Sequence, residues 1–454
     1  MVDQLESGVA GGGRAAAPAP PSPGKGSRRE GRKGLTAVLF LLPACILLGA
    51  LVVYPIFFSI VRSMFDANGD KFVGLGNYQE IFASPSTLTA LKNNFIWVII
   101  APTLATVLGL VFAVLTERVR WSTAFKVAVF MPMAISLTAS GVIWRLTYEQ
   151  NPELGLANSV GRVFVDTFRP PGEYPTARPG RGGDLVQSGK ALQTSGTHST
   201  GDTVNLGLVG IPPQSVPAGS QPAAGAQPGS GLHGVVWLDF TRGGGGQPNV
   251  VDPTEAGLPG MKVEAVASDG SVAASATTGN DGAYAFDGLA DGQYTVRLAD
   301  SNFRPPFGGI SWLGPSLVTP AIIAVFLWIW SGFAMVTIGA GLSALPREVL
   351  EAARTEGASE WQVFRRITVP LLMPVLTVVL VTLAINVLKI FDLIFIIPPG
   401  SSQDDANVLA LEMYRASFGG GRNEGLGSAL AIFLFLLVLP AMIFNFKRFR
   451  AENS

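Results

Sequence analysis

Long apolar runs separated by short charged segments dominate the pattern of this chain. A helix needs about 20 apolar residues to cross the hydrocarbon core of a bilayer. Runs of about this length cover residues 35–61, 95–115, 127–144, 312–345, 369–397 and 426–446. The pattern therefore predicts an α-helical membrane protein with six transmembrane helices.

The composition agrees with this interpretation and argues against several classes of function. The 454 residues are 48% hydrophobic and only 14% charged, whereas soluble domains carry about 25% charged residues. The net charge is zero, so nothing indicates a nucleic-acid partner. The two histidines and the single Cys45 lie in unrelated regions, which excludes a Cys/His metal cluster and an internal disulfide.

Basic residues predict which side of the membrane each loop occupies. Lysines and arginines gather near the end of residues 1–34, in the loop 118–126, in the loop 346–370 and from Lys447 onward. Six spans place all four segments on one side, and the positive-inside rule makes that side the cytoplasm. Residues 1–34 are rich in Gly, Ala, Pro and Ser, which predicts a disordered cytoplasmic tail.

A long insertion separates membrane helices 1–3, within residues 35–148, from helices 4–6, within residues 312–450. Residues 149–231 become rich in Pro, Gly, Ser and Thr, which predicts a flexible extracytoplasmic linker. Residues 232–300 alternate short β-type segments with Asp-Gly turns. We predict strands at 235–238, 261–266, 284–286 and 294–298. They would form an inserted extracytoplasmic all-β sandwich.

The charged loop 346–370 lies between the fourth and fifth apolar runs, and its pattern predicts two short helices. Gly357 stands where a helix ends in a left-handed residue. Ser359 and Gln362 have the spacing of a capping box at the start of a second helix. Spacing alone would fit an ordinary cytoplasmic loop with two amphipathic helices.

Particular residues of this loop point to a family. The pattern Glu351, Ala352, Ala353, Gly357, Ile367 and Pro370 resembles the EAA loop in permease subunits of binding-protein-dependent ABC importers of the maltose and alpha-glucoside type. Glu356 and Val369 depart from it, standing where Asp and Leu are usual. The string 72–78, FVGLGNY, resembles a segment on the outer side of the sugar-type permeases.

This resemblance implies the permease subunit of an ABC importer, in a bacterial cytoplasmic membrane, that carries a carbohydrate inward. The EAA loop would be the helix that couples to an ATPase. Two ATPase subunits, a second permease subunit and an extracytoplasmic solute-binding protein are the implied partners. ATP and Mg²⁺ would bind the ATPase, since this chain has no GxxxxGK[ST] sequence. It has no catalytic motif that would indicate an enzyme, and we expect it to bind no cofactor in the membrane region.

The predicted β domain resembles the prealbumin-like repeat domains of bacterial surface proteins, through GVVWLDF, EAGLPGMKVEAVASDG and TGNDGAYAFDGLADGQYTVRL. Some of those domains bind calcium through acidic residues near the first strand. The resemblance implies Asp239, Asp252 and Glu255 as the candidate calcium ligands here. The alternative to calcium binding is that these acidic residues only solvate a loop.

Three polar residues interrupt the fifth apolar run. Asn386, Lys389 and Asp392 follow at intervals of three, so one continuous helix would place them on one broad side. Charged residues within membrane spans are costly and usually functional. They would either line the solute pathway or form a neutralising Lys389–Asp392 pair of purely structural value.

Two other functions compete with that of an importer permease. A membrane-anchored surface or adhesion protein would need only one or two spans, and it leaves the EAA pattern without a role. A secondary transporter would favour internal symmetry between two halves, and none is visible in the sequence.

Overall fold

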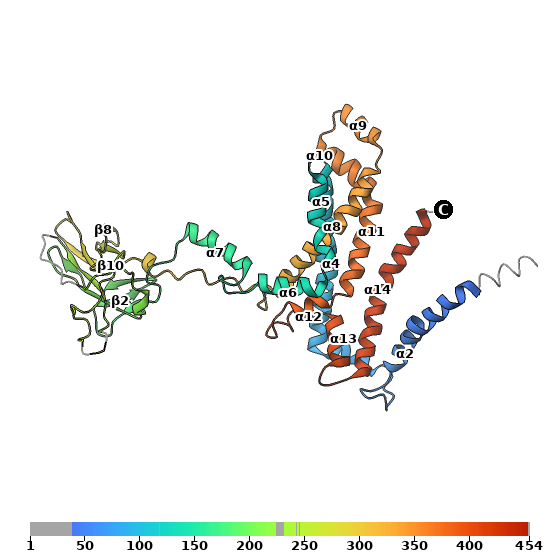
Figure 1. Cartoon of the computed structure of the whole chain (residues 1–454), viewed down its shortest axis with the longest axis horizontal. Helices are drawn as coiled ribbons and strands as arrows, with labels where there is room; N and C mark the ends of the chain where they lie inside the picture. The colour runs from blue at the N-terminus through green and yellow to red at the C-terminus, as the bar shows by residue number, and fades with distance from the viewer. Residues whose placement is uncertain (1–38, 118, 224–230, 242, 245, 453–454) are drawn as a thin grey trace, which may run out of the picture. The chain divides into compact units, whose positions relative to one another are not determined.

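The structure, a computed structural model, describes residues 39–452 except for 118, 224–230, 242 and 245 (Figure 1). The predicted disordered tail, residues 1–34, therefore lies outside the described residues. The chain divides into two compact units, which are treated separately below. Among the described residues, one unit comprises those up to Ser84 with Met413–Leu436, and the other comprises Pro85–Glu412 with those from Leu437 onward.

The first unit begins with an apolar helix over Leu39–Arg62 that contains a π-helical turn, η1 (Gly49–Val53), followed by α2 (Tyr54–Arg62). Its large apolar side chains are mostly exposed within the chain, as expected for a surface that faces lipid. The helix α3 (Gly76–Ala83) follows after a short loop. Phe82 of α3 meets Phe433 edge to face at 5.6 Å.

The string 72–78 closes the loop between α2 and α3. The buried Asn77 side chain donates from Nδ2 to the carbonyl oxygens of Ser63, at 2.8 Å, and Phe65, at 2.7 Å. Gly74 adopts φ +58°, a conformation that costs glycine little. Tyr78 places its hydroxyl 2.9 Å from Ser63 Oγ. The residues of this string therefore fix the loop through hydrogen bonds to the end of α2.

The second unit contains most of the membrane helices. They are α4 (Pro85–Glu117), α5 (Ser122–Phe130), η2 (Met131–Ala134), α6 (Leu137–Thr147), α8 (Val318–Ser343), α11 (Val369–Leu388) and α12 (Asp392–Ile396). Two further helices, α13 (Leu409–Phe418) and α14 (Glu424–Glu452), extend across the division between the units. The helices α4 and α8 approach so closely that any side chain at Gly109 would collide with Ala334. Such small-residue contacts are typical of membrane helix pairs.

Among the described residues, four helices are long and apolar enough to cross a membrane, or five if a bent pair counts as one span. The bent pair corrects the prediction of one continuous span at 127–144. It joins Ser122–Ala134 to Leu137–Thr147 at an angle of 101°. Pro132 lies in the 3₁₀ turn η2, and the Ser136 hydroxyl caps α6 by accepting from Ala139 N. The apolar part of α14 is shorter, Glu424–Pro440, so the six-span count remains a prediction.

The insertion holds a β domain with two sheets (Figure 1). The first has the order β1-β5-β6-β9, and the second β2-β3-β10-β7-β8 with β4 also pairing with β10. All the pairings are antiparallel except β5 with β6. The strands are β1 (Arg178–Pro179), β2 (Leu185–Ser188), β3 (Ala191–Thr194), β4 (His198–Ser199), β5 (Leu206–Val209), β6 (His233–Leu238), β7 (Lys262–Val266), β8 (Val272–Thr277), β9 (Ala283–Ala285) and β10 (Gln293–Leu298).

The prediction of a flexible linker over 149–231 is wrong for much of its length. That segment holds α7 (Leu156–Phe168) and strands β1 to β5. Leu192, Leu206 and Leu208 are buried in the same apolar core as Val236 and Val296. The early strands are thus part of the β domain, which begins well before residue 232, because they supply core side chains and sheet partners to the later strands.

Candidate functional site: the 346–370 loop and the broken fifth span

The 346–370 loop forms two short helices, α9 (Arg347–Thr355) and α10 (Glu360–Val363). At the end of α9, Ala358 N donates to Ala353 O and Gly357 N to Arg354 O, both at 3.0 Å. This pair of bonds is a Schellman motif. Gly357 has φ +86°, and no atom would lie within 4 Å of an added Cβ. The backbone angle alone therefore favours glycine there.

The start of α10 confirms the capping box predicted from the sequence. Ser359 N donates to Gln362 Oε1 at 2.8 Å, and Gln362 N donates to Ser359 Oγ at 3.4 Å. An ion pair crosses the turn, with Arg354 Nε 2.8 Å from Glu360 Oε1. The hydrogen bond and charge of Glu360 raise the pKa of the Arg354 guanidinium. The two helices are thus fixed to each other at both the backbone and the side-chain level.

Between α10 and α11 the chain makes a π-helical turn, η5 (Phe364–Thr368). A π turn contains an extra residue, which shifts the faces of the flanking helices. Trp361 and Phe364 stack with ring centroids 5.6 Å apart, and Trp361 is 66% exposed. A large aromatic side chain is therefore presented to solvent beside the α9–α10 turn.

The residues expected to couple to an ATPase lie mostly on the surface of this loop. Glu351, Ala352, Gly357 and Pro370 are exposed, while Ala353 and Ile367 are half-buried. None of these six residues is fully buried, so most of them are accessible on the surface of the loop.

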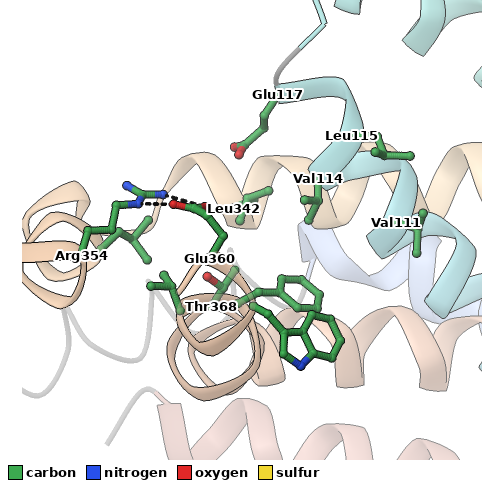
Figure 2. Close-up of a pocket in the computed structure, with 12 residues that line it drawn as sticks. Val111, Val114, Leu115, Glu117, Leu342, Arg354, Glu360 and Thr368 are labelled. Carbon is green, nitrogen blue, oxygen red and sulfur yellow. Dashed lines mark hydrogen bonds and ion pairs between the residues drawn. The ribbon is translucent and has the colours of Figure 1, made fainter. Parts of the chain in front are cut away.

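A cavity of about 430 Å³ lies beneath the loop (Figure 2). Val114 and Leu115 of α4, Leu342 of α8, and Trp361 of α10 are among its lining residues. Figure 2 shows the Arg354–Glu360 pair at its rim and Glu117, from the end of α4, reaching toward that pair. The cavity borders both loop helices and the ends of α4 and α8, so a movement of the loop would change its walls.

The structure changes the expected geometry of the fifth span. The helix α11 ends at Leu388, Lys389 occupies its C-cap, and α12 begins at Asp392. The three polar residues therefore do not share a face of one helix, which corrects the predicted span 369–397. Asn386 donates from Nδ2 to Thr382 O at 2.9 Å. Lys389 is exposed and Asp392 half-buried.

The described residues show no ion pair between Lys389 and Asp392. The structural alternative for these residues, a neutralising pair, is therefore not formed. Both charges lie at a break in the helix, and broken helices inside a membrane protein are tolerated where they are buried in protein or line a cavity. Their role in a solute pathway remains a prediction.

The sequence did not indicate that the third and fifth spans, which are both broken, contact each other through α6 and α12. Arg145 Nη1 of α6 donates to Ile396 O of α12 at 3.2 Å. A side chain at Gly141 would lie 3.0 Å from Ile396 Cγ2, so α6 and α12 pack closely. The only signals in the sequence were Pro132 and Ser136, which mark the break before α6.

The three acidic residues considered for calcium are each engaged by local donors. Glu255 is 2% exposed and accepts from Thr241 Oγ1 at 2.9 Å. Asp239 Oδ2 accepts from Asn249 N at 3.0 Å. Hydrogen bonds from Thr254 lower the pKa of Asp252. Within the described part of the chain, no group of three or more His, Cys, Asp and Glu residues is arranged to hold a metal ion. The calcium hypothesis remains untested: each carboxylate has a local hydrogen-bond donor, and Glu255 is buried rather than exposed to solvent.

Two family models match the chain. Residues 283–448 match a binding-protein-dependent transport system inner membrane component, and residues 249–307 match a carboxypeptidase regulatory-like domain. An ABC transporter permease protein of Caldicellulosiruptor sp. is 34% identical over 132 residues, which are 29% of this chain and 94% of that protein. The chain therefore belongs to the family of ABC importer permeases. It is a multi-pass membrane protein, the permease component of a binding-protein-dependent importer, and not itself catalytic.

Longer matches extend over nearly the whole chain. The osmoprotective compounds uptake permease protein GgtC of Synechocystis sp. is 26% identical, covering 92% of this chain and 99% of that protein. The alpha-glucoside transport system permease protein AglF of Rhizobium meliloti is 25% identical, covering 92% and 83%. A solved bacterial ABC transporter involved in alginate import shares the fold, with a TM-score of 0.55, 14% identity, and coverage of 95% of this chain and 100% of that one.

Proposed function

We propose that this chain is a permease subunit that translocates a carbohydrate, an oligosaccharide such as an alpha-glucoside, inward across a bacterial cytoplasmic membrane. It would cross the membrane six times, with both termini and the 346–370 loop in the cytoplasm and the β domain outside. A second permease subunit, two ATPase subunits and an extracytoplasmic solute-binding protein would complete the importer.

The observation that carries the proposal is the form of the 346–370 loop. Two short helices, fixed by the Gly357 turn, the Ser359–Gln362 capping box and the Arg354–Glu360 pair, stand between two membrane helices. The loop exposes four of the six residues of the EAA pattern and leaves the other two half-buried. A rigid, exposed element of this kind suits the transfer of ATPase closure to the membrane helices as a rigid-body movement.

The region in which α6 meets α12 supports a solute path near Asn386, Lys389 and Asp392. Helices that are broken at membrane depth, with polar groups at the breaks, are typical of transporter binding sites. An amide and a carboxylate can hydrogen-bond to sugar hydroxyls. The stacked rings of Phe391 and Phe395, 5.3 Å apart, would offer an apolar face nearby.

A carbohydrate is favoured by the alpha-glucoside and alginate transport named for two of the similar proteins. The osmoprotectant permease makes a small osmolyte the competing solute. The deciding test is uptake into proteoliposomes that contain the complete importer and ATP. We expect binding-protein-dependent uptake of a labelled alpha-glucoside. Uptake of a zwitterionic osmolyte in its place would refute the carbohydrate assignment, and uptake without ATP would refute the importer mechanism.

A further inference from the structure

The β domain concentrates its positive charge in one cleft. The cleft, about 700 Å³ in volume, is lined by four cations, Arg169, Arg178, Lys190 and Arg304, and by one carboxylate, Asp300. Residues 169–304 contain only eight lysines and arginines but twelve aspartates and glutamates. Half of the cations of an acidic domain therefore line a single cleft.

The remaining described cations of the domain are disposed differently. Lys262 Nζ lies 2.9 Å from Glu264 Oε1, and Arg297 Nη2 lies 2.7 Å from Glu264 Oε2. Arg181 lines an adjacent cleft that shares Arg178 with the first. By contrast, none of the four cleft cations forms an ion pair with an acidic side chain in the described ranges. The cleft thus keeps uncompensated positive charge.

Four separate segments bring these cations together. Arg169 follows α7, Arg178 lies in β1, Lys190 stands in the turn between β2 and β3, and Arg304 follows η4 (Asp300–Phe303). Backbone bonds fix two of these segments to each other, because Gly172 N donates to Arg304 O at 2.9 Å and Tyr174 N to Asn302 O at 3.1 Å. The cleft is therefore built by the fold.

We propose that this cleft binds an acidic glycan, a polymer whose sugar units carry carboxylates. Guanidinium and ammonium groups pair with carboxylates through charge-assisted hydrogen bonds. Apolar rings, from Pro175, Pro179, Pro305 and Phe303, also line the cleft and suit the apolar face of a pyranose. Cations spread over four segments match single charges repeated along a polymer better than one compact multivalent anion. The site lies in the β domain, and the inference is independent of which solute the importer carries.

The test uses the full chain in nanodiscs and three probes: oligogalacturonate, neutral dextran and polyphosphate. We expect oligogalacturonate to bind at low salt, to weaken as salt rises to about 0.5 M because exposed charges are screened, and to exceed dextran clearly. The double variant Arg178→Glu with Lys190→Glu should lower its affinity about tenfold or more. The matched control, Arg422→Glu, changes an exposed cation outside the domain and should have no effect.

Every other outcome overturns the proposal. Equal binding of dextran would show that charge is irrelevant. Preference for polyphosphate would assign the cleft to a phosphate polymer instead. Unchanged affinity in the double variant would place the site elsewhere, provided that the variant unfolds at the same temperature as the unaltered chain. Uptake of the transported solute is measured in parallel, so a failure here is distinguishable from a failure of the proposed function.

A second, independent observation concerns α7, which carries five large apolar side chains along one exposed stripe. Leu156, Val160, Val163, Phe164 and Phe168 are each between 64% and 72% exposed. On the other side of the helix, Arg162 Nε lies 3.4 Å from Asp166 Oδ2. A helix with one apolar and one charged side is the form that lies in a membrane interface.

The start of α7 is fixed at the ends of two membrane helices. Asn158 Nδ2 donates to Glu149 O, just after α6, and to Ile310 O, shortly before α8, both at 2.9 Å. We infer that α7 lies on the outer surface of the bilayer with its apolar stripe in the lipid.

Spin labels test this placement in a Cys45→Ser background, since Cys45 is the only cysteine. A label at Phe164→Cys should be accessible to lipid-soluble oxygen and protected from a water-soluble nickel reagent. A label at Asp166→Cys, on the charged side, should show the opposite. Equal access of the nickel reagent to both positions would overturn the proposal that the apolar stripe contacts lipid. Protection of Phe164→Cys that appears only when the solute-binding protein is added would assign the stripe to that protein.

Discussion

Arg354 and Glu360 face each other across the Gly357 turn, with Nε and Oε1 2.8 Å apart. The pair joins the last turn of α9 to the first residue of α10. It lies at the rim of the cavity beneath the loop. The two loop helices are thus joined by a pair of charges as well as by the backbone, next to a cavity that the ends of α4 and α8 also line.

Reversal of one charge in this pair should weaken coupling, and reversal of both should restore it. We expect Arg354→Glu to lower solute-stimulated ATP hydrolysis about two- to fivefold, a modest effect because the pair is exposed to solvent. The double variant Arg354→Glu with Glu360→Arg should recover most of the loss at low salt. Equal activity in the single and double variants, both below that of the unaltered chain, would show that the pair itself is not the cause.

The fifth-span residues should affect transport without affecting assembly. Asn386→Ala and Asp392→Asn should each reduce uptake about three- to tenfold, as expected for the loss of a ligand hydrogen bond. The amount of assembled complex should not change. Because no Lys389–Asp392 pair is formed, the exchange Lys389→Asp with Asp392→Lys should not rescue uptake. Full rescue by the exchange would restore the structural alternative, and normal uptake in both single variants would remove these residues from the path.

The loop could be predicted from the sequence more fully than the spans or the β domain. Helix caps are local, so Gly357 and Ser359 could be assigned from their near neighbours alone. The breaks near Pro132 and Lys389 were missed because the apolar runs continue through them, and hydropathy does not respond to a break in a helix. Among the missed strands, β3 and β4 pair with β10, and β5 pairs with β6, so their partners are not visible in the local sequence. Leu192 in β3, for example, pairs with Leu298 in β10.

The β domain should be separable from the membrane helices. The backbone bond from Tyr174 N to Asn302 O brings the two ends of the domain together. Deletion of residues 172–301, with the ends joined, should therefore leave a chain that inserts in the membrane and assembles with its partners. Size-exclusion chromatography of the detergent-solubilised complex measures this. Aggregation of the deleted chain at normal expression levels would show that the membrane helices need the domain.

The stability of the β domain should fall in acid through Glu264. Burial opposes ionisation of this side chain, but hydrogen bonds and charges from Lys262 and Arg297 outweigh burial and lower its pKa below the ordinary value of 4.5. A carboxylate with a lowered pKa in the folded state stabilises above its unfolded pKa, and this contribution disappears as the pH falls through the folded pKa.

Calorimetry of the full chain measures this effect. The unfolding transition of the β domain is the one that is absent when residues 172–301 are deleted. Between pH 7 and pH 3, the melting temperature should fall about 3–5 °C more in the unaltered chain than in Glu264→Gln. The conservative variant keeps the shape of the side chain and removes its charge. An equal fall in both proteins would mean that another group controls the acid sensitivity.

The central claim, that the 346–370 loop docks a partner ATPase, is tested most directly at Gly357. The added side chain would meet no neighbour, so substitutions differ only in how well they tolerate φ +86°. A left-handed conformation costs an ordinary residue roughly 1–2 kcal/mol and is adopted more readily by asparagine. The measurement is the amount of ATPase that copurifies with each variant, together with ATP-driven uptake. We predict a loss of about fivefold or more in both for Gly357→Val and near-normal values for Gly357→Asn, with equal membrane insertion. Normal copurification and uptake in Gly357→Val would contradict the assignment of this loop.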